Sequence, residues 1–100
     1  MGAHIAVPQD KIAAFCRKWR VKELSLFGSV LTDRFGPESH VDVLLAFEKG
    51  VPWDLWDLVD MREELKEIFS REVDIVEKQA LRNPFRKREI LGNREIIYAG

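Results

Sequence analysis

The sequence Leu26-Phe27-Gly28-Ser29 ends one apolar segment, and after ten further residues His40-Val41-Asp42 opens the next. Glycine allows the backbone to approach a ligand closely, and serine provides a hydroxyl and a free amide where a helix begins. Asp42 is expected to face the same crevice from the second segment. The pattern therefore predicts a site for a phosphate and a metal ion between two strands.

The composition is typical of one small globular domain. The 100 residues are 46% hydrophobic and 33% charged, and the 16 basic and 17 acidic side chains nearly cancel. This balance gives no overall electrostatic reason to expect nucleic-acid coating or membrane binding. Cys16 is the only cysteine, which excludes an intrachain disulfide and a thiolate metal cluster. Neither a secretion signal nor an apolar run of about 18 residues is found, so a cytoplasmic location is expected.

Hydrophobic periodicity predicts alternating helices and strands in the first half of the chain. Apolar residues recur at helical spacing over residues 9–20, with a basic outer face that solvation explains. A short strand over 23–27 and a short helix or turn over 29–35 follow. Residues 38–47 form an apolar run without clean alternation, which is typical of a central strand covered on both faces.

The second half continues the same alternation. A helix with an acidic outer surface is expected over 54–69, and a strand of about five residues over 72–76. Trp53 and Trp56 could be core residues or an exposed anchor for a partner, and the core is favoured. Asn83-Pro84 is a good helix start, and apolar residues seven apart extend this last helix to Tyr98. The fold class is therefore α/β, with a small mixed sheet of three strands, or four, flanked by helices.

Acidic residues on the predicted strands supply the candidate chemistry. Asp74 lies inside a short apolar strand, where a charge is costly unless it is paired or binds a metal. Residues i and i+2 of a strand share a face, so His40 and Asp42 should project side by side. Carboxylates are natural ligands of Mg²⁺, and two divalent ions can clamp the attacking and leaving oxygens of a phosphoryl transfer. Gly28 and Ser29 would hold the nucleotide phosphates.

These segments together resemble the minimal nucleotidyltransferase (MNT) family, a branch of the DNA polymerase β-like superfamily. The family signature is a Gly-Ser pair, about ten residues, Asp-x-Asp, and a third Asp on a later strand. Matching segments are Phe27-Gly28-Ser29, His40-Val41-Asp42 and Val73-Asp74-Ile75-Val76. The likeness spans the whole chain, including the helix after Pro52-Trp53 and the closing segment 81–85. It implies that residues 1–100 form a single minimal nucleotidyltransferase domain with a palm-like sheet.

The resemblance also implies a function. Such proteins are typically the antitoxins of toxin–antitoxin modules whose toxins are helical HEPN-domain ribonucleases, and they transfer AMP from ATP to a tyrosine of the toxin. By resemblance, Gly28 and Ser29 would bind the nucleotide, while Asp42 and Asp74 would be catalytic and hold Mg²⁺, or Mn²⁺. Asp74 would also help to deprotonate the acceptor hydroxyl.

His40 departs from the family pattern, because the first carboxylate of Asp-x-Asp belongs at its position. An imidazole has no negative charge, offers one lone pair, and favours Zn²⁺ or Mn²⁺ over Mg²⁺. As a metal ligand His40 would therefore weaken the site, and Glu38 could rescue it only in part. Three functions follow from this: a weakened AMP transferase, a degenerate antitoxin that neutralises its toxin by direct binding, or a nucleotide sensor without turnover.

A basic run near the C-terminus is the other candidate for a binding surface. It could meet an acidic partner or an RNA backbone, or it could be a solvated helix face that balances the acidic middle helix. The solvated face is favoured. Only Phe85 interleaves with the charges, so direct nucleic-acid binding is not expected. The run consists of Arg82, Arg86, Lys87 and Arg88, with Arg94 further on.

Overall fold

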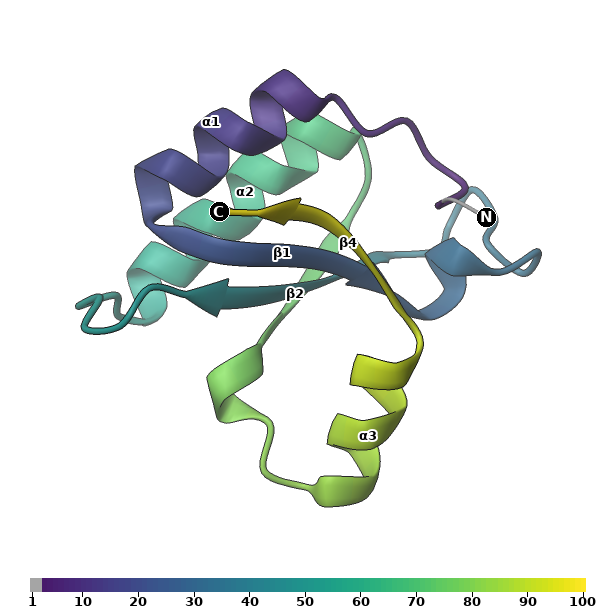
Figure 1. Ribbon diagram of the computed structural model, residues 1–100. Coiled ribbons are helices and arrows are strands. Elements are labelled where there is room, and N and C mark those ends of the chain that lie inside the picture. Colours follow the sequence, from purple (N-terminus) through teal and green to yellow (C-terminus); the bar gives the residue numbers. More distant parts are fainter. Residues whose placement is uncertain (1–2) are drawn as a thin grey trace.

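The computed structural model describes residues 3–100, which form α-helices, a β-sheet and two short 3₁₀ turns (Figure 1). None of the helices in this range is both long and apolar enough to cross a membrane. The elements in chain order are α1 (Gln9–Trp19), β1 (Val21–Phe27), η1 (Gly28–Leu31), β2 (Val41–Phe47), α2 (Leu55–Phe69), β3 (Val73–Glu77), η2 (Lys78–Ala80), α3 (Pro84–Gly92) and β4 (Arg94–Ala99).

The four strands form one mixed sheet in the order β3-β2-β1-β4. β1 is antiparallel to both of its neighbours, β2 and β4, whereas β2 and β3 are parallel. The parallel pair requires a crossover, and α2 provides it. The predicted α/β class and mixed sheet are confirmed, and the sheet has the fourth strand. β2 is central and almost fully buried, as its unbroken apolar run predicts.

The prediction that the last helix extends to Tyr98 is wrong. Asn83 caps α3 as expected, because its side chain accepts hydrogen bonds from the amides of Phe85 and Arg86. The helix nevertheless ends at Gly92, and the following residues pair with β1 as β4. Their β-branched and aromatic side chains fit an edge strand, so the spacing of seven residues was a coincidence. The turn predicted over 29–35 is also shorter, and is a single 3₁₀ turn.

The main hydrophobic core lies between the sheet and the two helices α1 and α2. Leu24 and Leu26 of β1, with Met61 and Leu65 of α2, are fully buried there. Cys16 belongs to the same cluster, and burial raises the pKa of its thiol to about 12. It is therefore the inert core residue that its helical position predicts.

The two candidate tryptophans have different environments. Trp53 is half-buried against this core, where its ring meets Trp19 edge-on at 5.3 Å and its indole nitrogen donates to the Trp19 carbonyl. Trp56 is 75% exposed, so the expectation that it is a core residue is wrong. It lies in the first turn of α2, which Asp54 caps, and the buried residues of this helix begin only at Met61.

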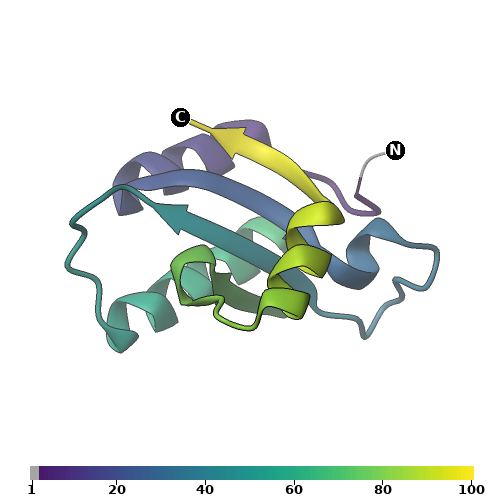
Figure 2. The same cartoon turned by 60° about the horizontal axis from the view of Figure 1, so that its bottom comes forward.

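In the described part of the chain, η2, the segment that follows it and α3 cover the opposite face of the sheet (Figure 2). Its cluster of buried residues is small and consists of Leu44, Leu81 and Ile90. Asp42 precedes Leu44 by two positions on β2, and Asp74 precedes Val76, which packs against this cluster, by two on β3. Side chains alternate along a strand, so both aspartates project onto this thinly covered face.

Candidate functional site

Strand pairing brings the predicted site residues to one end of the sheet. Asp42 is directly paired with Asp74 on β3 and with Phe27 on β1. Gly28 and Ser29 follow Phe27 immediately, so the Gly-Ser turn, Asp42 and Asp74 lie in that order across three neighbouring strands. Segments that are far apart in the sequence therefore meet as their spacing predicts.

Gly28 is required by its backbone and by its neighbour. Its φ of +78° lies in the left-handed region that L side chains rarely adopt. A Cβ at this position would also overlap with the carboxylate of Asp42. The turn thus approaches the acidic side chain as closely as a backbone can, and this approach is the physical reason for the glycine.

The two carboxylates influence one another. Partial burial raises the pKa of Asp42, and the negative charge of Asp74 raises it further. Electrostatic interactions with His40 and Arg86 oppose this rise in the pKa of Asp42. Two nearby carboxylates that repel one another form a site that a cation would stabilise.

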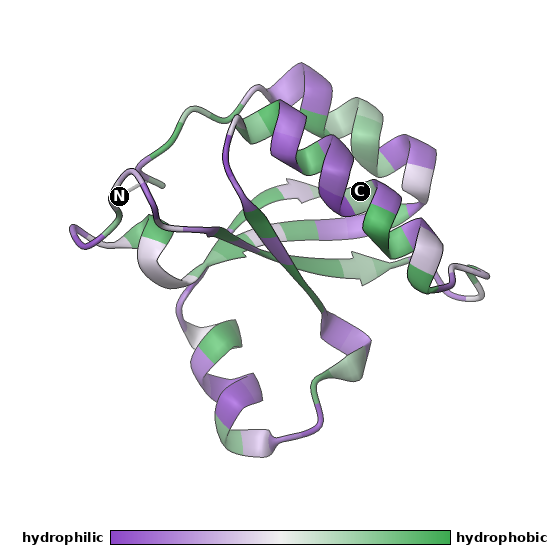
Figure 3. Cartoon of the chain, turned by 180° about the vertical axis from the view of Figure 1, so that it is seen from behind, coloured by the Kyte–Doolittle hydropathy of each residue, from purple (hydrophilic) through white to green (hydrophobic). Residues whose placement is uncertain are grey.

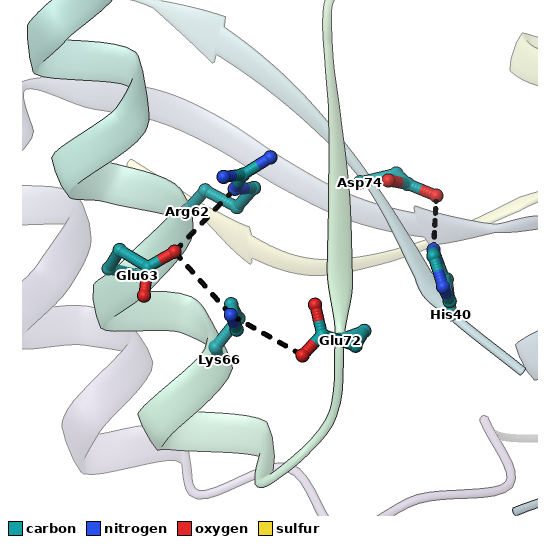
Figure 4. A network of polar contacts seen from close by, with 6 residues as sticks. All are labelled: His40, Arg62, Glu63, Lys66, Glu72 and Asp74. Atoms are coloured by element: carbon teal, nitrogen blue, oxygen red, sulfur yellow. Dashed lines mark hydrogen bonds and ion pairs between the residues drawn. The ribbon is translucent and has the colours of Figure 1, made fainter. Parts of the chain in front are cut away.

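His40 lies just before β2 and contacts the second aspartate. Its Nδ1 is 2.9 Å from Asp74 Oδ2, and both side chains are about half exposed (52% and 57%). Figure 4 shows this pair apart from a second group of ion pairs, in which Arg62, Glu63 and Lys66 of α2 interact and Lys66 also contacts Glu72, just before β3. The imidazole therefore contacts Asp74, the strand partner of Asp42.

The described part of the chain contains no group of three His, Cys or acidic residues arranged to hold a metal ion. The donors at the site are two carboxylates with one engaged imidazole. Mg²⁺ is usually bound through one or two carboxylates together with substrate phosphates rather than in an all-protein cage. Asp42 and Asp74 could supply the one or two carboxylates of such a site, with the substrate phosphates completing it. Glu38 lines a depression beside Lys66 and Arg71, and neither Asp42 nor Asp74 lines that depression.

Arg86 is a site residue that sequence reasoning missed. It is the third residue of α3, and it shares a groove with Asp74. The sequence feature that could have predicted this position is the cap at Asn83. The cap sets where α3 begins, and therefore which residue of the basic run faces the sheet. Arg94 is occupied differently, since it forms an ion pair with Glu23 at 2.6 Å. The basic run is therefore divided between separate environments.

Comparisons with known proteins agree with this geometry. A protein-family model described as a nucleotidyltransferase domain matches residues 10–97. The protein adenylyltransferase MntA of Thermococcus cleftensis is 30% identical over 81 residues, which is 81% of this chain and 77% of the relative. A protein of Methanocaldococcus jannaschii, provisionally named a protein adenylyltransferase, is 35% identical over the same share of this chain and 84% of its own length.

Solved structures share the fold. A toxin–antitoxin complex with AMP-PNP contains a chain that matches 93% of this one with a TM-score of 0.74 at 15% identity, over 74% of its own length. A complex of the tri-AMPylated Shewanella oneidensis HEPN toxin with its MNT antitoxin matches 92% with a TM-score of 0.64 at 14% identity, over 70% of that chain. At these identities the likeness concerns the fold.

Proposed function

The chain belongs to the nucleotidyltransferase domain family, whose model covers residues 10–97, and we propose that it transfers AMP from ATP to a tyrosine of a cognate HEPN-domain ribonuclease toxin. The observation that carries the proposal is that Asp42 on β2 pairs with Asp74 on β3 and with Phe27 on β1, directly before the Gly28-Ser29 turn. A relative named protein adenylyltransferase, and a structural neighbour described as an antitoxin bound to an AMPylated HEPN toxin, support the choice of reaction and partner.

In this proposal the two ends of the site have different roles. The amides of the Gly28-Ser29 turn and the Ser29 hydroxyl bind the triphosphate next to β1. Asp74, on the far side of Asp42, accepts the proton of the tyrosine hydroxyl. The tyrosine oxygen forms a bond to the α-phosphorus of ATP, the bond from that phosphorus to the bridging oxygen breaks, and pyrophosphate leaves. The proton passes from Asp74 to solvent.

Asp42 and Asp74 would also hold the divalent cation that accompanies ATP. When bound, Mg²⁺ would neutralise the charge that develops on the phosphate oxygens. The repulsion that raises the pKa of Asp42 favours such a cation. Ser29 and Gly28 would fix the phosphates on the other side of the same carboxylate.

His40 weakens the site in this account for two reasons. It brings no negative charge to the position where the family has its first carboxylate. It also contacts Asp74 Oδ2 at 2.9 Å, so it competes for an oxygen that the cation and the acceptor proton both need. Loss of one preorganised electrostatic group commonly costs several kcal/mol of transition-state stabilisation.

Replacing this residue by an acidic one tests the proposal. His40→Asp should increase the rate of AMP transfer from labelled ATP to the partner by about tenfold to a hundredfold with Mg²⁺. His40→Asn is the matched control, since it removes the imidazole without adding a charge and should give a smaller gain. A wild type that is already fast, together with no gain for His40→Asp, would show that His40 does not impair the site.

The second candidate function is a degenerate antitoxin that neutralises the toxin by direct binding. His40 favours it, and so does Trp56, which is 75% exposed. A stable complex with the partner that inhibits its ribonuclease activity without transfer of label would support this function. Binding of ATP with neither transfer nor partner would instead support a nucleotide sensor.

A further inference from the structure

The outer side of β3 is an unpaired strand edge. Among residues 3–100, β2 is the only strand that pairs with β3, and β3 ends the sheet. Figure 3, the view from behind, shows β3 in front of the other strands, between α2 and α3. An unpaired edge presents backbone donors and acceptors that can bind another chain.

The strand pairing identifies which backbone groups face outward. The amide of Val41 donates to the carbonyl of Glu72 at 2.8 Å, and the parallel register then continues through Glu77. In a parallel ladder the N–H and C=O of one residue point to the same side, and the sides alternate along the strand. Asp74 and Val76 therefore bond to β2, while the backbones of Val73, Ile75 and Glu77 face outward.

A groove of about 500 Å³ runs along this edge. Four consecutive residues of β3, Asp74 to Glu77, line it, and the start of α2 and the segment from Ala80 to Arg86 form its sides. Its lining is mixed: apolar side chains such as Leu55, Leu58 and Leu81 lie beside charged ones, which are Arg62, Asp74, Glu77 and Arg86. Leu55, one of the lining side chains, is 70% exposed, and Phe85, which precedes the lining residue Arg86 in the chain, is 81% exposed.

The groove is continuous with the proposed catalytic site, because Asp74 belongs to both. The phosphate-binding turn lies across the sheet from the groove, with Asp42 in between. A chain entering along β3 therefore approaches Asp74 from the side opposite the nucleotide. An acceptor hydroxyl needs this approach if it is to attack in line with the departing pyrophosphate.

We propose that this groove binds the acceptor segment of the partner protein as an extended strand added to β3, with its tyrosine delivered to Asp74. This inference rests on the proposed function. In such β-augmentation the backbone hydrogen bonds give affinity and alternate side chains enter pockets. A residue opposite Asp74 would have its Cβ about 5 Å away on the same face. On the added strand, the residues two positions before and after this one would place their side chains along the apolar part of the groove.

Glu77→Pro tests the backbone pairing directly. Glu77 has a φ of −85°, which proline can adopt, and its N–H faces away from β2. The substitution therefore removes one outward donor without breaking the sheet. Glu77→Ala is the matched control, because it removes the carboxylate and keeps the donor. Affinity for the full-length partner is measured by calorimetry without ATP, so the result does not depend on AMP transfer.

Glu77→Pro should weaken partner binding about tenfold relative to Glu77→Ala, with an unchanged affinity for ATP. Equal partner affinities for the two variants, or no binding by the wild type, would overturn the proposal. A loss of ATP affinity in Glu77→Pro would also overturn it, since the groove would then be a nucleotide pocket.

A second pair of variants decides the matter if Glu77→Pro does not fold. Leu55→Arg places a charge in the groove, whereas Trp56→Arg places one on the neighbouring residue, which does not line it. Both side chains are at least 70% exposed, so both variants should fold. Leu55→Arg should weaken partner binding at least tenfold more than Trp56→Arg does. Equal effects would assign the contact to the outer surface of α2 and overturn the proposal.

Discussion

The two faces of the sheet differ in how much apolar surface they bury. One face packs against α1 and α2 around fully buried residues such as Leu24 and Leu65. The other has the small buried cluster of Leu44, Leu81 and Ile90 of α3, and it carries Asp42 and Asp74 in place of further apolar side chains. The first face supplies most of the hydrophobic stabilisation.

Because of this difference, the residues that stabilise the fold and the carboxylates of the candidate site lie on opposite faces of the sheet. A carboxylate pair could not lie on the well-covered face without a large desolvation cost. The thin cover of α3 leaves the pair accessible and still partly buried, which raises the pKa of Asp42. Substitutions on the two faces should therefore change different measured quantities.

The largest effect is expected from removing a carboxylate on the thinly covered face. Asp42→Asn should lower the rate of AMP transfer by about a hundredfold to a thousandfold, because one of the two carboxylates that would hold the cation at the reacting phosphate is lost. Its free energy of unfolding should not fall. Transfer is measured with labelled ATP and the partner, and unfolding with urea. A variant that loses activity only because it unfolds would remove the distinction between the faces.

A truncation in the main core, on the other face, should lower the free energy of unfolding. Leu65→Ala removes a fully buried side chain and should destabilise the fold by about 2–5 kcal/mol. The matched variant Leu81→Ala, in the small cluster, should cost less because its side chain is 8% exposed and has fewer neighbours that lose contacts. Urea unfolding of both variants checks this order. Equal losses would mean that the α3 face contributes as much stability as the main core.

Two glycines have a positive φ, and comparing them distinguishes the effect of backbone strain from the effect of a Cβ that meets Asp42. Gly28 (φ +78°) and Gly50 (φ +84°) should both lose about 1–2 kcal/mol of stability when replaced by alanine. Only the Cβ at position 28 meets the Asp42 carboxylate, whereas position 50 has nothing nearby. Gly28→Ala should therefore reduce transfer at least tenfold, and Gly50→Ala should leave the rate per folded molecule unchanged. Equal activities would show that the close approach does not matter.

The smallest effect concerns pH. The pKa of Asp42 is raised above its ordinary value of 3.8, so the native state binds more protons than the unfolded state in the range just above that value. The contribution of Asp42 to stability therefore falls as pH rises through this range, and its penalty is complete at neutral pH. Asp42→Asn should be more stable than wild type at pH 7 and equal to it below pH 3.8. Unfolding curves across this range test the sign.

Much of the fold follows from local signals in the sequence. The apolar stripe of α1, the unbroken run of β2 and the Asn83 cap each predict their element without reference to the rest of the chain. β4 was not predicted as a strand, because its residues repeat the apolar spacing of α3. Only the unpaired edge of β1 determines that they form a strand, and such an edge is a tertiary feature.

The candidate site was predictable to a similar extent. The spacing of the Gly-Ser pair, Asp42 and Asp74 is encoded along the chain, and strand pairing brings the three together as expected. The hydrogen bond between His40 and Asp74 and the position of Arg86 depend on side-chain placement between elements. No local pattern determines such placement, so these details required the structure.

One measurement tests the central claim most directly: the intact mass of the cognate HEPN-domain partner after incubation with this protein, ATP and Mg²⁺. We predict a mass increase of one or more AMP units on a partner tyrosine with the wild type, a faster increase with His40→Asp, and an increase at least about a hundredfold slower with Asp42→Asn. A partner that binds tightly and stays unmodified with both wild type and His40→Asp would contradict the claim of catalysis.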